Sequence, residues 1–206
     1  MSFTNVRWLA AATAIVALAV AAGCGDSSTE PTKVSMSISE KGKAATFNTP
    51  KSFKGGLVEL SVKNNGKAPH GVQLVRYTGS HTADDALKQL GSNSDKTPDW
   101  LRAEGGTPAV AGGQSTKASL NLTAGNYLMI DSAQLGPGSG PPANAQVKVT
   151  SGDTGDLPDT PGNVTAARTG KDKYAWEISG LKAGTNEITF DSEGKDALHF
   201  IIAAPV

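Results

Sequence analysis

Residues 56–75 read GLVELSVKNNGKAPHGVQLV, and this stretch decides the fold expected for the chain. Apolar and polar residues alternate over 58–62, a turn follows at Asn64-Asn65-Gly66, and a second apolar run begins just after His70. An alternation of period two is typical of a half-buried β-strand, and Asn and Gly tolerate the positive φ angles of tight turns. The stretch therefore predicts a unit made of a strand, a turn, a histidine and a second strand.

A weaker copy of this unit lies near the C-terminus, where residues 184–203 read GTNEITFDSEGKDALHFIIA. Glu59 aligns with Glu187, and with one inserted residue His70 aligns with His199. We therefore predict two related β modules, at 34–150 and 163–206, joined by a linker at 151–162. Few residues follow His199, so the second module is predicted to be partial.

Composition favours a turn-rich β protein. The chain has 206 residues, with 24 Gly and 11 Pro, which are common in turns. Lys and Arg number 19 and Asp and Glu also number 19, so the charge pattern indicates no nucleic-acid partner. No Ser-His-Asp order, Gly-x-Ser-x-Gly elbow or phosphate loop is found, so we predict that the protein is not an enzyme.

The single cysteine lies at the end of an N-terminal targeting pattern. Arg7 precedes an uncharged apolar run at 8–22, and Ala21-Ala22-Gly23-Cys24 follows. This resembles the lipobox of bacterial lipoproteins, although Leu is usual where Ala21 stands. The resemblance implies a signal peptide at 1–23, lipid attachment at Cys24, a tether at 24–33 and an extracytoplasmic protein anchored to the cell membrane. The alternative is an ordinary secretory signal in which Cys24 is incidental.

The rest of the first module predicts a β-sandwich with one short helical excursion. Strands are expected at 34–39, 44–49, 58–62, 71–77, 118–122, 127–131 and 145–150, with a turn at 40–43. Thr82 is a good N-cap for a helix that ends at Gly91, and 98–101 could form another short helical turn. No strand is expected between that turn and Gln114. In the second module, strands are expected at 164–168, 173–179, 186–190 and 199–203.

Residues 51–150 resemble the plastocyanin-like domains of the cupredoxin family. The resemblance is carried by His70 after the turn, by Gly125-Asn126-Tyr127 at the start of a late strand, and by Pro137-Gly138 in the loop after it. It implies a Greek-key β-sandwich, and it implies that type 1 copper would be bound by two His, one Cys and one Met. His70 matches the first ligand, but Asp131 stands at the cysteine position, Ser139 stands at the second histidine, and no Met follows.

Two functions remain open from the sequence. The leading hypothesis is a lipid-anchored binding or interaction module with no cofactor, no type 1 copper site and a protein partner of unknown identity. The alternative is a protein that binds copper or another metal through His70, in metal handling or electron transfer. The weak candidates for further ligands are Asp131, Met129 and His81, with His199 as the equivalent of His70 in the second copy. The simpler interpretations are a backbone-bonded His70, an exposed His81, a core Met129 and a turn or core His199.

Overall fold

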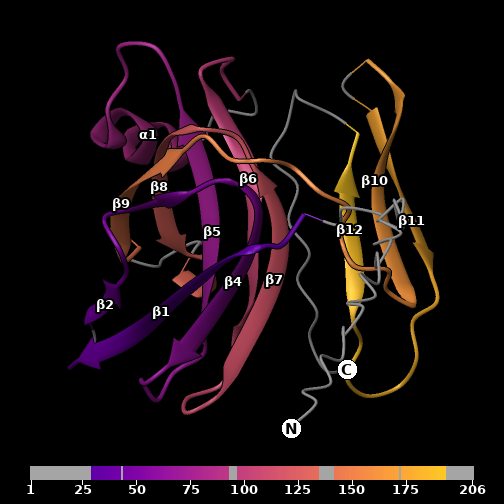
Figure 1. The fold of residues 1–206 in the computed structure, drawn as a ribbon, viewed down its shortest axis with the longest axis horizontal. Coiled ribbons are helices and arrows are strands. Elements are labelled where there is room, and N and C mark those ends of the chain that lie inside the picture. The colour runs from indigo at the N-terminus through magenta and orange to yellow at the C-terminus, as the bar shows by residue number, and fades with distance from the viewer. Residues whose placement is uncertain (1–28, 43, 93–96, 135–141, 172, 194–206) are drawn as a thin grey trace, which may run out of the picture.

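The computed structural model describes residues 29–42, 44–92, 97–134, 142–171 and 173–193. Most of these residues lie in β-strands, and Figure 1 shows how the strands are arranged. The first part of the chain contains β1 (Thr32–Lys41), β2 (Ala44–Asn48), β3 (Ser52–Lys54), β4 (Gly56–Asn64), β5 (His70–Tyr77), β6 (Leu101–Val110), β7 (Ser115–Leu122), β8 (Gly125–Asp131) and β9 (Asn144–Thr150). Helix α1 (Ala83–Leu90) follows β5, and a 3-10 turn, η1 (Ser132–Gln134), follows β8.

These strands form two sheets that pack as a sandwich. One sheet has the order β2-β1-β4-β7, and the other has the order β3-β9-β8-β5-β6. In the first sheet β1 runs antiparallel to β2 and parallel to β4. Alternate residues of each strand point between the sheets, as the period of a strand requires. The buried core between the sheets consists of Val34, Met36, Ile38, Val58, Leu60, Val62, Val72, Leu74, Leu122, Tyr127, Met129, Val147 and Val149.

A second, smaller core covers the outer face of the five-stranded sheet. Strand β5 is central in that sheet, between β8 and β6, so its side chains are buried on both faces. The outward residues of β5 and β8 pack against helix α1 and the start of β6, in a cluster made of Val75, Tyr77, Ala83, Ala86, Leu101, Leu128 and Ile130. This cluster explains why the chain leaves the β pattern after β5.

Helix α1 is fixed by its capping residues, as the sequence predicts. The Thr82 hydroxyl accepts a hydrogen bond from the Asp85 backbone N–H, and the Asp85 carboxylate accepts one from the Thr82 N–H, which completes a capping box. Hydrogen bonds from the backbone and side chain of Thr82 lower the pKa of Asp85, and burial opposes them. The helix ends at Gly91, the residue that the sequence indicates.

Strand β6 corrects the prediction for the segment between the helix and Gln114. No strand was expected there, and 98–101 was expected to turn into a helix, but 99–100 form a plain turn and β6 begins at Leu101. Gly105, Gly106 and Pro108 hid the strand, because Gly and Pro are unusual in central strands. They are tolerated because β6 is an edge strand with register shifts against β5. A Cβ at residue 106 would lie 1.9 Å from the Val72 carbonyl oxygen, so this crossing needs a glycine.

The start of the predicted linker is bound to the sandwich. The Leu57 N–H donates to the Asp153 carbonyl oxygen at 2.8 Å. The Asn121 side chain donates to the Gly155 carbonyl oxygen at 2.8 Å and accepts from the Gly155 N–H at 3.2 Å. Gly56 has φ 74° here, and a Cβ at this residue would lie 2.1 Å from the Asp153 oxygen. Residues 153–155 therefore lie against the start of β4 and the end of β7, which a free linker would not do.

A third sheet lies beyond this segment and contains β10 (Gly162–Gly170), β11 (Lys173–Ser179) and β12 (Ile188–Ser192) (Figure 1). Its order is β11-β10-β12, with β11 antiparallel and β12 parallel to β10. The sheet β2-β1-β4 has the same order and directions. Leu60 pairs with Val34 in the first sheet, and Ile188, the residue that the sequence alignment matches to Leu60, pairs with Gly162 in the third.

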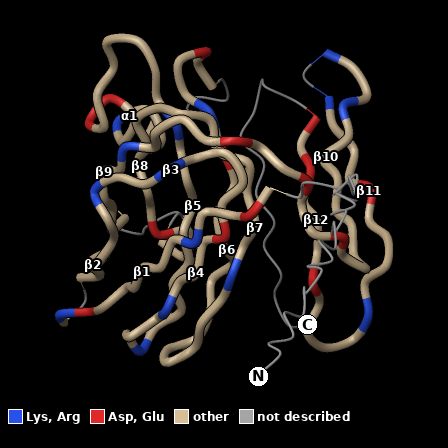
Figure 2. The backbone as a smooth tube through the Cα atoms, in the orientation of Figure 1, with Lys and Arg blue, Asp and Glu red and all other residues tan. Residues whose placement is uncertain are grey.

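The fold class is confirmed: the chain is all-β, with a sandwich, one short helix among the described residues, and a further small sheet. Within the described ranges, no helix is long and apolar enough to cross a bilayer. Figure 2 shows Lys and Arg interspersed with Asp and Glu along the traced backbone, without a face of a single sign. Cys24 and His199 lie outside the described residues, so the signal, the lipid attachment and the last predicted strand stay predictions. The tether predicted at 24–33 extends too far, because Thr32 and Lys33 already belong to β1 and pair with β4.

Candidate functional site: a buried histidine between two carboxylates

Four polar residues close one end of the sandwich interior. Glu40, Asn64, His70 and Asp131 each continue an inward-facing row of apolar side chains on β1, β4, β5 and β8. Asn64, His70 and Asp131 are buried, with only 0%, 2% and 0% of their surface exposed. Buried polar groups are costly unless they are hydrogen-bonded, so the partners of these side chains decide what the cluster does.

Asp131 binds one side of the His70 ring. His70 Nδ1 lies 2.5 Å from Asp131 Oδ2. The other carboxylate oxygen, Oδ1, accepts hydrogen bonds from the backbone N–H of Gly71 at 3.3 Å and of Ala133 at 3.1 Å. The antiparallel pairing of β5 and β8 places Val72 opposite Asp131, which brings the start of β5 to the end of β8. Both Asp131 oxygens therefore have partners inside the protein.

Glu40 binds the other side of the ring. His70 Nε2 lies 2.8 Å from Glu40 Oε1. The same carboxylate accepts hydrogen bonds from the backbone N–H groups of Lys67 and Ala68, both at 2.9 Å. Glu40 thus joins the end of β1 to the turn that precedes His70. Its side chain is 17% exposed, so it covers His70 from solvent.

Asn64 holds the turn from inside. Its amide nitrogen donates to the carbonyl oxygens of Ala68 and Val110, both at 2.8 Å, and its amide oxygen accepts from the Gly66 N–H at 2.8 Å. Three hydrogen bonds from one buried side chain fix the path of the backbone that leads into β5. The turn signal at Asn64-Asn65-Gly66 therefore carries a second role that the sequence analysis did not assign.

The geometry of the cluster favours the protonated form of the His70 ring. A carboxylate only accepts hydrogen bonds, so both ring nitrogens must carry a proton when each faces an ionised carboxylate. Burial alone would lower the pKa of His70. The hydrogen bonds from Glu40 and Asp131 and the charges of both groups outweigh burial, and the pKa of His70 is raised above 6.5. Hydrogen bonds from the Lys67 N–H, from His70 and from the Ala68 N–H, in decreasing order of effect, lower the pKa of Glu40 from 4.5 to about 2.

These shifts predict a stability optimum between about pH 4.5 and 6.5. The raised pKa of His70 contributes stability that is complete below 6.5 and is lost as the pH rises through the folded-state value. The lowered pKa of Glu40 contributes stability that is complete above 4.5 and is lost as the pH falls towards 2. Urea unfolding of the wild type and of Glu40→Gln, measured from about pH 2 to 9, should show a difference that is largest in this window. Glu187→Gln, at an exposed position, should follow the wild type at every pH.

The other sequence candidates do not join the cluster. Met129 is fully buried in the main core, where its sulfur accepts a hydrogen bond from the Thr49 hydroxyl at 3.7 Å. His81 is half-buried rather than exposed, and its ring stacks on Trp100 with the centroids 4.0 Å apart. It follows the far end of β5, away from His70. Ser139, like Cys24 and His199, lies outside the described residues.

Glu40 is the site residue that the sequence analysis missed. It was assigned to a turn at 40–43, but it is still part of β1. One signal was available, because the inward alternation Val34, Met36, Ile38 reaches Glu40 in its next step. What the sequence does not show is the parallel register of β1 and β4, which pairs Ile38 with Asn64 and so brings Glu40 to the turn before His70.

No known family profile matches the chain, and no curated protein matches it. Among solved structures, auracyanin A of Chloroflexus aurantiacus, a "blue" copper protein, is 21% identical, covers 57% of this chain and 99% of its own, and has a TM-score of 0.38. Rusticyanin of Thiobacillus ferrooxidans is 15% identical, with 60% and 79% covered and a TM-score of 0.39. A multicopper oxidase is 17% identical, with 72% and 54% covered and a TM-score of 0.34.

The sandwich can be compared with the sequence resemblance on its own strand arrangement. Its own strand order, with the histidine that opens β5 and the strand β8 beside it, has the arrangement that the sequence resemblance implies. With TM-scores of 0.34 to 0.39, the likenesses to solved structures carry no argument about this chain, and the copper of those proteins is not assigned to it.

The residues present do not fit a type 1 copper site. Such a site needs a soft thiolate and imidazole nitrogens with free lone pairs. Here a hard carboxylate, Asp131, stands at the cysteine position and binds the histidine itself, and both ring nitrogens of His70 are occupied by carboxylates. Within the described ranges, no group of three or more His, Cys, Asp or Glu residues is arranged to hold a metal ion.

Proposed function

We propose that this protein is a lipid-anchored, extracytoplasmic binding module in which an internal ion-pair cluster occupies the place of a type 1 copper centre. The observation that carries the proposal is the pairing of His70 with Asp131 at 2.5 Å and with Glu40 at 2.8 Å. The polar atoms of all three side chains are satisfied by one another and by backbone N–H groups. This arrangement supports a structural role for the cluster, so we propose no enzymatic activity there.

Metal binding would have to compete with this cluster. A metal that used either ring nitrogen would displace a proton from His70 and break one of its two ion pairs. Leaving a buried charge without its partner is strongly unfavourable. The same physical argument weighs against the alternative, a copper- or metal-binding protein that uses His70 in a remodelled site.

A copper titration separates the two functions. The mature protein is titrated with Cu(II) near pH 6.5, followed by visible absorption and by metal analysis after dialysis. We expect no intense visible band and no retained stoichiometric copper. The variants His70→Ala and His81→Ala form a matched pair, one inside the cluster and one outside it. One equivalent of retained copper in the wild type and in His81→Ala, lost in His70→Ala, would establish the alternative and overturn the proposal.

An exposed apolar surface supports the interaction role. The large apolar side chains that are most exposed among the described residues all belong to the segment after 156. Four of them lie on the third sheet: Trp176, Ile178, Ile188 and Phe190, which are 50%, 62%, 39% and 37% exposed. Trp176 and Phe190 stack with their ring centroids 6.2 Å apart. Apolar groups clustered in this way commonly mark a site of protein interaction. We read this sheet as the partial second module and as the interaction surface, with its partner protein unidentified.

The anchor is tested at Cys24. Two acyl chains hold a protein at a membrane stably, because each buried CH₂ contributes about 0.8 kcal/mol. In a bacterial host, the wild type should be found in the membrane fraction, and Cys24→Ser should be found largely in the soluble extracytoplasmic fraction. A Cys24→Ser variant that stays with the membrane to the same extent as the wild type would contradict lipid attachment at this residue.

A further inference from the structure

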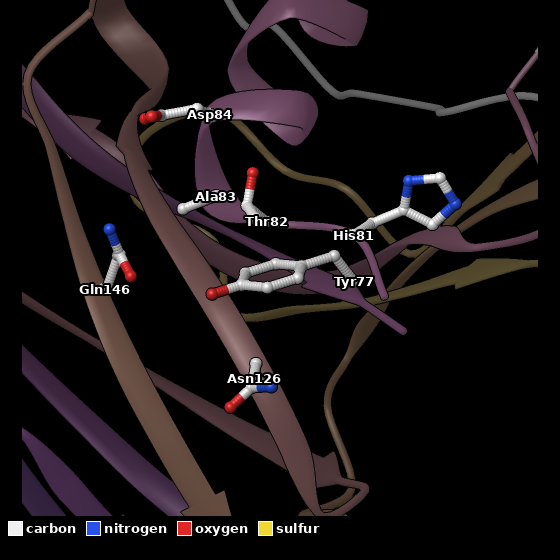
Figure 3. Close-up of a pocket in the computed structure, with 7 residues that line it drawn as sticks. All are labelled: Tyr77, His81, Thr82, Ala83, Asp84, Asn126 and Gln146. Atoms are coloured by element: carbon white, nitrogen blue, oxygen red, sulfur yellow. The ribbon is translucent and has the colours of Figure 1, made fainter. Parts of the chain in front are cut away.

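A small polar pocket opens on the outer face of the five-stranded sheet, at the end of β5 opposite His70 (Figure 3). Its volume is about 290 Å³. The side chains that line it come from β5, β8, β9 and the first turn of α1, and they are Tyr77, His81, Thr82, Ala83, Asp84, Asn126 and Gln146. For a strand of the length of β5, its two ends lie on the order of 20 Å apart. The pocket is therefore separate from the histidine cluster.

Tyr77 gives the pocket a polar group without a partner. Its side chain belongs to the outer core, and the residue is only 8% exposed. Figure 3 shows its ring lying across the pocket, with the hydroxyl towards Gln146 and Asn126. Among the described residues, the Tyr77 hydroxyl makes no hydrogen bond, and it is not one of the buried polar atoms that lack a partner, so it meets the solvent that fills the pocket. A phenol that faces a pocket in this way can both donate to and accept from a ligand.

The remaining lining groups define the chemistry of that ligand. The side chains of Asn126 and Gln146 are exposed, and each offers both a donor and an acceptor. Asp84 adds an acceptor that the capping box of α1 does not use, because Thr82 and Asp85 form that box. No Lys or Arg lines the pocket, so an anionic ligand has no counter-charge there.

From this geometry we propose that the pocket binds a neutral sugar ring. Adjacent hydroxyl groups both donate and accept, which matches a phenol, two amides and a carboxylate around one small cavity. A volume of about 290 Å³ lies at the lower end of the range for small-molecule sites and suits one ring rather than an extended ligand. This inference rests on the proposed binding role, because it names a class of ligand for that role. It does not involve His70 or copper.

The test is a titration of the mature protein followed by backbone amide NMR shifts. The probes are glucose, galactose, mannose and N-acetylglucosamine, each added separately, with inorganic phosphate as the anionic comparison. We expect at least one of the sugars to shift the amides of Tyr77, Asn126 and Gln146 saturably, and phosphate to leave them in place. Tyr77→Phe keeps the ring in the outer core and should weaken binding about tenfold, the effect of losing one ligand hydrogen bond. Tyr174→Phe removes a hydroxyl outside the pocket and should bind like the wild type.

Two results would overturn the inference. One is the absence of saturable shifts at these residues with every neutral sugar, and the other is equal binding by the wild type and Tyr77→Phe. A thermal unfolding curve of Tyr77→Phe shows whether the variant is folded, and Asn126→Ala at an exposed position provides a second variant that should also weaken binding. If no sugar binds, the expected result of the copper titration stays the same. If copper binds at His70, the expected result of the sugar titration stays the same. The two proposals can therefore fail independently.

Discussion

Asp131→Asn is expected to destabilise the protein by about 3–5 kcal/mol at pH 6, the range for removing one partner of a buried ion pair. Asp131 is fully buried and His70 is 2% exposed, so solvent cannot replace the lost charge. The variant keeps the size of the side chain, which separates the loss of charge from the creation of a cavity. Urea unfolding, with the free energy extrapolated to water, measures the change.

The amide cannot satisfy the donors that surround Asp131. His70 Nδ1 and the N–H groups of Gly71 and Ala133 all point at the carboxylate. An amide offers one acceptor oxygen, and its nitrogen would face a donor in either orientation. Losing the Asp131 charge also lowers the pKa of His70, so the difference between variant and wild type should shrink as the pH rises and His70 loses its proton in both proteins.

The control for this experiment is Asp156→Asn, at an exposed position in the segment after the sandwich. Surface substitutions of this kind usually change stability by less than about 0.5 kcal/mol. If Asp131→Asn falls within the same range as Asp156→Asn, the carboxylate is not paired with a buried imidazolium, and the interpretation of the cluster is wrong.

Asn64→Ala is expected to cost about 3 kcal/mol, the second largest effect. The substitution removes three hydrogen bonds to the backbone, each with a net value of about 1 kcal/mol, and leaves buried groups without partners. Because these bonds fix the turn before β5, the pairing of His70 with Glu40 should weaken as well. The variant should therefore show a lower pKa for His70 in addition to a lower unfolding free energy.

The neighbouring Asn65 provides the control. Its side chain is exposed, and its backbone N–H keeps the bond to the Ile38 carbonyl oxygen whatever the side chain is. Asn65→Ala should unfold within about 0.5 kcal/mol of the wild type, as surface substitutions generally do. Equal losses in the two variants would mean that Asn64 acts through general turn propensity rather than through its three bonds.

Much of the sandwich could be predicted, because local patterns set it. The alternation at 58–62 and the turn signal after it correspond to β4 and the turn into β5, and Thr82 with Asp85 begins helix α1 as expected. The sequence also placed Asp131 at the cysteine position of a cupredoxin-like sandwich, and the pairing of β5 with β8 brings it to His70. These features depend on the period of the strands and on residue types with strong preferences.

What could not be predicted depends on contacts between distant segments. The role of Glu40 needs the parallel register of β1 and β4, and a single sequence does not specify which strands become neighbours. Strand β6 was missed because its Gly and Pro residues suit an edge strand with bulges, and an edge position is known only once the sheet is formed. The attachment of residues 153–155 to the sandwich is likewise a tertiary property.

The cluster joins three strands at one end of the sandwich core. The His70 ring, which opens β5, is joined to β1 through Glu40 and to β8 through Asp131. Buried ion pairs often add little net stability compared with apolar packing, so their value here lies in holding one arrangement of the turn. The end of the sandwich is then fixed for whatever the rest of the surface binds.

The ionisation state of His70 tests this account most directly. Long-range proton–nitrogen NMR of the mature protein, with the His70 signals assigned by their loss in His70→Ala, reports the protonation of both ring nitrogens as the pH is raised. The account predicts that both nitrogens are protonated at pH 6.5 and that the pKa of His70 lies above its ordinary value of 6.5. A neutral ring with one bare nitrogen at that pH, and a pKa at or below 6.5, would contradict it.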